Sequence, residues 1–219
     1  MSSKTKGKSA GRTASAPVNP KVFLHVGCGT KAKDRTTPAF NTDSWQEVRL
    51  DIDAQVKPDL VGTITDMSAV ADVSMDAVFS SHNLEHLYAH EVPKALSEFK
   101  RVLRPDGFLV LTCPDLQSIC ALVAEGKLLE PAYVSPAGPI SPIDILFGHR
   151  RALAEGNEYM AHRCGFTQKV LADVLRQAGF ASVIVKRRQA RFFDLWALAN
   201  VTRIDQAALR EMAGRHFPV

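Results

Sequence analysis

The sequence predicts one α/β domain in which a mainly parallel sheet carries helices on both faces. Short apolar runs of strand length alternate along the chain with segments whose apolar residues recur at helical spacing. Parallel strands need long crossover connections, so this alternation is typical of a sheet covered by helices. With 219 residues, 46% of them hydrophobic and 23% charged, the chain has the length and composition of one packed domain.

Seven segments have the apolar character of strands. In chain order they are residues 21–26, 47–52, 59–62, 76–81, 108–113, 181–186 and 192–199. In such sheets ligands bind beyond the carboxyl ends of the strands. The residues at or just after these ends include Gly27, Asp51, Asp66 and Ser81. We therefore expect the functional site around them.

Helices are predicted between several of these strands. Apolar residues fall on one face over 89–103, and Pro105 and Gly107 then stop that helix. A second amphipathic helix is predicted over 167–178, followed by Gly179. The segment 205–215 is predicted to form an ordinary exposed helix, within a C-terminal helical tail over 202–219.

The domain itself is predicted over residues 21–201. One segment precedes it, and another is an insertion within it. Residues 1–20 carry basic residues among small polar ones and are predicted to be a disordered basic tail. This tail accounts for the net charge of +4, so the remaining chain is near neutral. Residues 115–165 are rich in proline and glycine, and a connection of this length is often functional. We expect a partly helical lid over the site.

The composition also indicates in which cellular compartment the protein is expected. No apolar run reaches the roughly 18–20 residues that a membrane span needs, and the N-terminus has no apolar signal segment. The four cysteines are scattered and form no Cys-x-x-Cys pair. A cytoplasmic protein is the resulting expectation.

Gly27-Cys28-Gly29 follows the first strand directly, at a turn where the backbone can approach a ligand closely. A tight turn without a ligand is the alternative interpretation. Asp51 ends the next strand, where a carboxylate can accept hydrogen bonds from a ribose diol. Together the two features indicate an adenosine-type cofactor, but they do not separate NAD from S-adenosylmethionine.

A series of motifs makes that separation. They are Leu24–Thr30, Arg49–Asp53, Asp66-Met67, Asp76–Leu87 and Leu103–Leu111. Over residues 21–115 the chain resembles the class I S-adenosylmethionine-dependent methyltransferases, and among them the type 11 group. The resemblance implies a Rossmann-like, doubly wound sheet of seven mostly parallel strands with an antiparallel last strand. It also implies S-adenosylmethionine as cofactor.

The resemblance also implies roles for individual residues. Gly27, Cys28 and Gly29 would line the methionine moiety, and Asp51 would hold the ribose hydroxyls. Around the adenine and the methyl donor, the expected residues are Ile52, Asp66, Met67, Ser81 and His82. His25 replaces the acid common before the first glycine, so its contact to the cofactor's amino group is altered. Lys31 replaces the third glycine, and Pro38 argues against a regular helix after the turn.

Histidines recur at 82, 86 and 90, a spacing that brings imidazoles to one helical face. The resemblance accounts for His82 and for Glu85-His86 without a metal, and we expect none. His86 is the candidate catalytic residue, as a general base near the acceptor. A structural role, in which it bonds the loop to the strand ends, stays open.

The predicted lid supplies candidate acceptor contacts at His149, Tyr159 and His162. Neighbouring arginines suit an acidic or phosphorylated acceptor, although a solvated charged surface is the plainer interpretation.

The main hypothesis is a methyltransferase acting on a small-molecule or glycan-type acceptor. A catalytically inactive, methyltransferase-like binding or scaffold protein is the first alternative, because the turn at His25 and Lys31 is irregular. An NAD-dependent oxidoreductase rests only on the glycine pattern. Ser81-His82-Asn83-Leu84 takes the place of the tetrapeptide that base-flipping enzymes need, which argues against a nucleic-acid acceptor. The oligomeric state stays open.

Overall fold

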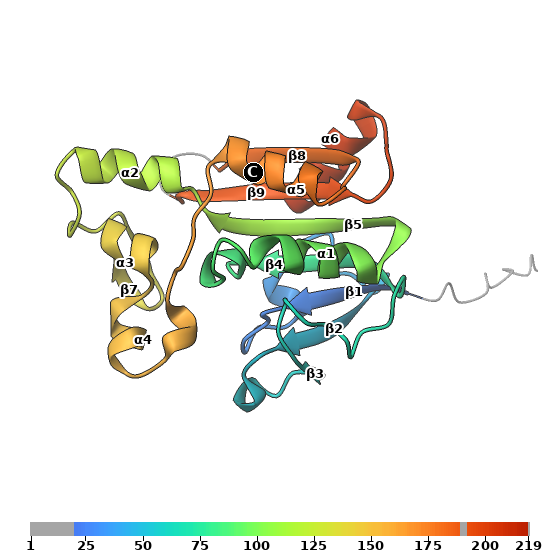
Figure 1. The fold of residues 1–219 in the computed structure, drawn as a ribbon, viewed down its shortest axis with the longest axis horizontal. Helices are drawn as coiled ribbons and strands as arrows, with labels where there is room; N and C mark the ends of the chain where they lie inside the picture. Colours follow the sequence, from blue (N-terminus) through green and yellow to red (C-terminus); the bar gives the residue numbers. More distant parts are fainter. Residues whose placement is uncertain (1–19, 189–191, 219) are drawn as a thin grey trace, which may run out of the picture.

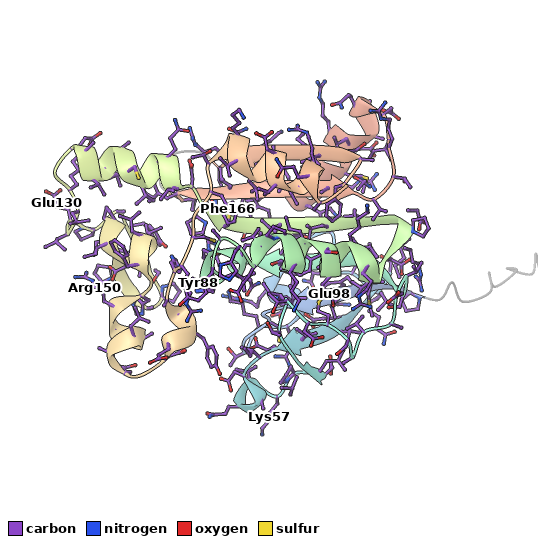
Figure 2. All side chains as sticks on the ribbon, viewed as in Figure 1. Lys57, Tyr88, Glu98, Glu130, Arg150 and Phe166 are labelled. Atoms are coloured by element: carbon purple, nitrogen blue, oxygen red, sulfur yellow. The ribbon has the colours of Figure 1, made fainter. Side chains whose placement is uncertain are left out.

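The computed structural model describes residues 20–188 and 192–218, and a seven-stranded sheet is its central feature (Figure 1). The strands lie in the order β3-β2-β1-β4-β5-β9-β8. Their bounds are β1 (Lys21–Val26), β2 (Trp45–Asp51), β3 (Leu60–Val61), β4 (Met75–Ser81), β5 (Leu103–Pro114), β8 (Ser182–Arg187) and β9 (Asp194–Asn200). Strand β9 is antiparallel to both neighbours, and the other six are parallel. The predicted Rossmann-like sheet is confirmed.

Helices α1 (Val92–Val102) and α5 (Gln168–Gln177) cover one face of the sheet (Figure 1). Their apolar residues are buried against strand residues in the main hydrophobic cluster. Both helices lie within the predicted ranges. Strand β5 begins at Leu103, earlier than predicted, because the Arg104–Gly107 turn stays strand-like and is accommodated by a register shift against β4.

The opposite face lacks an α-helix between β1 and β2. The segment there forms only a short 3-10 helix, η1 (Lys33–Arg35), as Pro38 and its polar neighbours predicted. Phe40 covers the sheet instead, and its ring stacks on Phe23 with 4.4 Å between centroids. Helix α6 (Gln206–His216) completes the cover.

The prediction that the last helix is merely exposed is therefore wrong. Leu209, Ala213 and His216 of α6 are buried. The missing helix leaves apolar side chains of the sheet to be covered, and burying apolar area is the main favourable term in folding. The basic tail predicted for residues 1–20 lies, except for Pro20, outside the described residues.

Residues 116–160 form a small subassembly beyond the carboxyl ends of the strands, at the left of Figure 1. Its elements are α2 (Leu116–Ala124), β6 (Tyr133–Ser135), β7 (Gly138–Ile140), α3 (Pro142–Phe147), α4 (Arg150–Ala154) and the 3-10 helix η4 (Glu158–Met160). Two more 3-10 helices, η2 (Ala54–Val56) and η3 (Leu84–His86), follow β2 and β4. Among the described helices, none has the length and apolar character to span a membrane.

The turns after β1 and β4 meet at a close contact. Gly27 has a φ of +57°, and a Cβ placed there would lie 1.8 Å from Asn83 Oδ1. The Asn83 amide donates hydrogen bonds to Val26 O at 3.0 Å and to Ser80 Oγ at 3.2 Å. Only glycine therefore fits between the two strand ends.

Gly27→Ala is expected to destabilise the protein more than Gly29→Ala. Both glycines have positive φ, which costs an alanine about 1–3 kcal/mol, but a Cβ at Gly29 meets nothing within 4 Å. At Gly27 the new methyl group also displaces the Asn83 amide, which adds about 1–3 kcal/mol for lost hydrogen bonds. Urea denaturation of the two variants measures the difference. Equal free energies of unfolding would show that the Asn83 contact is not tight.

His216 is a buried titratable group on the face that α6 covers. Its Nδ1 lies 2.9 Å from the Thr37 hydroxyl, and its ring packs against Phe40. Burial, together with the nearby charge of Arg215, lowers the pKa of His216 to about 4. The imidazole is therefore neutral in the folded protein.

We expect this residue to make the protein less stable in mild acid. The unfolded chain binds the proton near pH 6.5 and the folded chain only near pH 4, so this contribution to stability is lost as the pH falls between these values. Its size is on the order of 3 kcal/mol. His216→Gln should flatten the dependence of the unfolding free energy on pH over that window, and the exposed control His90→Gln should not. A slope that survives in His216→Gln assigns the effect to other groups.

Candidate functional site

A cavity of about 740 Å³ opens at the carboxyl ends of β1, β2 and β4. Its floor consists of the turns that follow these strands, and its opposite wall comes from residues 133–163 and from Phe192 and Phe193. Cavities of this size hold small-molecule ligands and cofactors. The cavity thus lies where the strand order predicts a ligand site.

Asp51 is the anchored acid of this cavity. Its Oδ2 accepts a hydrogen bond from the Gly29 amide at 2.7 Å, and its Oδ1 accepts from the Asp53 amide at 2.9 Å. Each carboxylate oxygen keeps a second acceptor position. The carboxylate is therefore fixed in direction while it can still accept from hydroxyl groups in the cavity.

Arg49 holds the glycine turn in place of a helix. Its guanidinium donates to Gly29 O at 2.6 Å and to Lys31 O at 3.1 Å. Cys28 between the glycines is buried, and burial raises the pKa of its thiol. The turn thus presents backbone and a neutral side chain to the cavity.

Most residues predicted for the site do line this cavity. They are Gly27, Cys28, Gly29, Asp51, Ile52, Ser81, His82 and His86, with His149, Tyr159 and His162 from the lid segment. Three predicted residues, His25, Asp66 and Met67, are not among the lining residues.

His25 lies inside the sheet layer and not in the cavity. It is buried, and its Nδ1 lies 2.7 Å from Glu47 Oε1. Burial lowers the pKa of His25. Glu47 also accepts from the Lys33 amide at 2.9 Å. His25 thus supports the segment after β1.

Asp66 and Met67 have contacts outside the set of residues that line the cavity. Asp66 is exposed and accepts from the Ser68 amide, whereas the Met67 amide donates to Glu98 Oε2 at 2.7 Å. Thr63 and Ile64 line the cavity in their place. Thr63 and Ile64 could have been predicted from the sequence, because they come just after the short strand β3, which ends at Val61.

The turn after β4 carries a buried acid among histidines. Glu85 is completely buried, and its Oε1 lies 3.1 Å from His82 Nδ1. Burial alone raises the pKa of the Glu85 carboxyl, but the hydrogen bond and charge of His82 outweigh it, so the net shift is downward. The second carboxylate oxygen, Oε2, has no hydrogen-bond partner. Sequence reasoning did not assign Glu85 a role.

The segment Ala161–Cys164 is bound to this turn. The amides of Arg163 and Cys164 both donate to the Glu85 carbonyl oxygen, at 2.7 and 3.2 Å. His86 Nδ1 lies 3.1 Å from Ala161 O, and the rings of His86 and His162 are 4.9 Å apart. Residues more than seventy positions apart in the chain are thereby held together at the cavity. His90, the third histidine of the sequence pattern, is exposed and stacks on Tyr88.

The wall opposite the strands carries polar residues, Arg163 among them, and an apolar part. The residues that form it include Tyr133, Ile140, Ile145, Met160, Phe192 and Phe193. Arg150 and Arg151 do not line the cavity, since they pair with Asp144 at 2.7 Å and with Glu155 at 3.0 Å. The apolar part suits an uncharged or aromatic group, whereas Arg163 keeps a cationic side chain at the cavity.

Residues 24–111 match the sequence profile of a family described as a methyltransferase domain. No curated protein sequence matches the chain. Among solved structures, the chain is similar to a 1,6-didemethyltoxoflavin-N1-methyltransferase from Burkholderia thailandensis with bound S-adenosylhomocysteine. The identity is 17%, the alignment covers 83% of this chain and 71% of that one, and the TM-score is 0.52.

Two further structures show the same fold. The chain is 16% identical to an S-adenosylmethionine-dependent methyltransferase from Methanosarcina mazei, over 85% of this chain and 95% of that one, with a TM-score of 0.54. It is 15% identical to the CurJ carbon methyltransferase, over 86% of this chain, with a TM-score of 0.56, and it spans 50% of that protein's length. Residues 24–111 therefore match the methyltransferase-domain profile that the motifs resemble, and the solved structures share the fold of the whole chain.

Proposed function

We propose that the protein binds S-adenosylmethionine in this cavity and transfers its methyl group to a small-molecule acceptor. The observation that carries the proposal is the fixed carboxylate of Asp51 beside the glycine turn. A ribose diol needs two hydrogen-bond acceptors at one place, and the free acceptor positions of Asp51 supply them. The same cavity has room for a second molecule on the side of residues 133–163.

The remaining cofactor contacts follow from the lining of the cavity. Ile52 is half exposed, so it offers an apolar surface to the adenine ring, next to Thr63 and Ile64. The backbone of Gly27–Gly29 faces the methionine portion. Ser81 and His82, at the end of β4, then lie closest to the methyl donor. Contacts of Asp66 and Met67 to the adenine, which the resemblance implies, stay a prediction.

When bound, the cofactor supplies a methyl group on a sulfonium, whose transfer moves the S–C bonding pair to sulfur. Alignment of donor and acceptor can supply much of the rate of such a displacement. The rigid turns after β1, β2 and β4 provide that alignment for the donor. The apolar wall of Tyr133, Met160 and Phe193 provides it for the acceptor and limits access of water.

In this proposal the general base is His86, the candidate that the sequence suggested. Its Nδ1 lies within hydrogen-bond distance of the Ala161 carbonyl oxygen, so this nitrogen carries the proton and Nε2 keeps a lone pair. That lone pair can accept a proton from an acceptor hydroxyl or amine.

An NAD-dependent oxidoreductase fits this site less well. A dinucleotide pyrophosphate is held at the N-terminus of the helix after β1. In the described part of the chain, only the 3-10 helix η1 follows β1 before β2 begins. A binding protein without turnover stays the second candidate, since His25 stands in place of the usual acid, contacts Glu47 and does not line the cavity.

Calorimetric titration with S-adenosylhomocysteine tests the cofactor. We expect one saturable site, and at least tenfold weaker binding by Asp51→Asn, because the amide nitrogen replaces one of the two acceptors. Asp43→Asn, at an exposed position outside the cavity, is the matched control. NAD should not bind. Absence of S-adenosylhomocysteine binding by the folded protein contradicts the proposal. Equal affinities of the wild type and Asp51→Asn for S-adenosylhomocysteine also contradict it.

A further inference from the structure

Three cavity-lining residues bring potential metal ligands together. Glu85, His86 and His162 each offer one ligand atom, and these atoms lie within 4.8 Å of one another. Tetrahedral ligands at about 2.1 Å from one ion lie about 3.4 Å apart, so side-chain movements on the order of 1 Å would close the set. We propose that Glu85, His86 and His162 bind one divalent transition-metal ion beside the methyl-transfer site.

The two imidazoles are oriented for this role by the backbone. His86 Nδ1 is 3.1 Å from Ala161 O, and His162 Nδ1 is 2.7 Å from Ile145 O. A carbonyl oxygen only accepts, so Nδ1 carries the proton in both rings and Nε2 carries the lone pair. Metal-binding histidines are held in this way, with the second ring nitrogen donating to a carbonyl or carboxylate.

Glu85 supplies an independent reason to expect a metal ion at this place. Its side chain is completely buried, and Oε2 has no hydrogen-bond partner. An unpaired buried carboxylate oxygen is costly, and such groups are usually paired or coordinate a metal. His82 pairs only with Oε1. A cation between Glu85 and the two imidazoles satisfies the oxygen that the protein leaves without a partner.

The donor set determines the class of metal. Two imidazole nitrogens and one carboxylate oxygen suit Zn²⁺, Fe²⁺ or Co²⁺, whereas Mg²⁺ prefers oxygen ligands throughout. Three protein ligands leave coordination positions open, as in catalytic zinc sites. The ion is therefore able to bind a further ligand from the cavity.

A ligand bound to this ion from the cavity limits the chemical class of the methyl acceptor. This step rests on the proposed methyl transfer. An ion at this place binds an oxygen-bearing acceptor, such as a phenol or enol, and lowers the pKa of its hydroxyl group. The proton is released to solvent, the oxygen forms the new bond to carbon, and the S–C bonding pair stays on sulfur. His86 then acts as a ligand and not as the base, because one lone pair cannot serve both roles.

The test is titration of Co²⁺ into the full chain, without an affinity tag and after chelator treatment, followed by visible absorption. We expect one Co²⁺ per chain, displaced by Zn²⁺ but not by Mg²⁺. Glu85→Gln and His162→Gln should each weaken binding at least tenfold, and His90→Gln, which changes an exposed histidine, should bind as the wild type does. No S-adenosylmethionine is present, so the result is independent of the cofactor titration.

A second measurement uses the wild-type protein alone, in case the variants fail to fold. Zn²⁺ should shift the Nε2 resonances of two histidines in ¹⁵N NMR spectra, with Nδ1 remaining protonated in both. Folded wild-type protein that shows no saturable Co²⁺ absorption and no such shifts overturns the proposal. Unchanged Co²⁺ binding by folded Glu85→Gln and His162→Gln also overturns it.

Discussion

The contact between Gly27 and Asn83 is the constraint on which the site depends. It joins the turn after β1 to the turn after β4, and it works because Gly27 has no side chain and Asn83 is held by Val26 O and Ser80 Oγ. The first turn carries the amide that fixes Asp51, and the second continues into Glu85 and His86. The positions of both turns at the cavity are thus set by one contact between adjacent parallel strands.

The sheet face opposite α1 shows how the fold accommodates an irregular first connection. Without a helix between β1 and β2, Arg49 and Lys33 hold that segment by donating to backbone carbonyls, and Phe40 packs on the sheet. Helix α6 then closes the core from the other end of the chain. A buried histidine, His216, lies at this junction. The turn after β1 is therefore held in place by these contacts, although no α-helix lies between β1 and β2.

The sequence allowed the sheet, α1, α5 and most of the cavity floor to be predicted, because these depend on local periodicity and on residues next to strand ends. Asp66 and Met67 were assigned by resemblance, but the loop after β3 turns Thr63 and Ile64 inward and ties Met67 to Glu98. Burial of α6 depends on a missing helix far away in the chain. His162 was predicted only as an acceptor contact, since its proximity to His86 arises from tertiary hydrogen bonds that leave no periodic signal.

The buried carboxylate of Glu85 is energetically costly. Burying a carboxylate costs several kcal/mol unless charge and hydrogen bonds compensate for it. Here one oxygen is paired with His82, and the other has no hydrogen-bond partner. The neighbouring imidazoles of His86 and His162 already donate their Nδ1 protons to backbone carbonyls. Neither imidazole can donate to Glu85 from Nε2 in that neutral form. Burying this unpaired oxygen therefore costs stability in the protein alone, whereas a cation shared by the three side chains would make the oxygen a ligand.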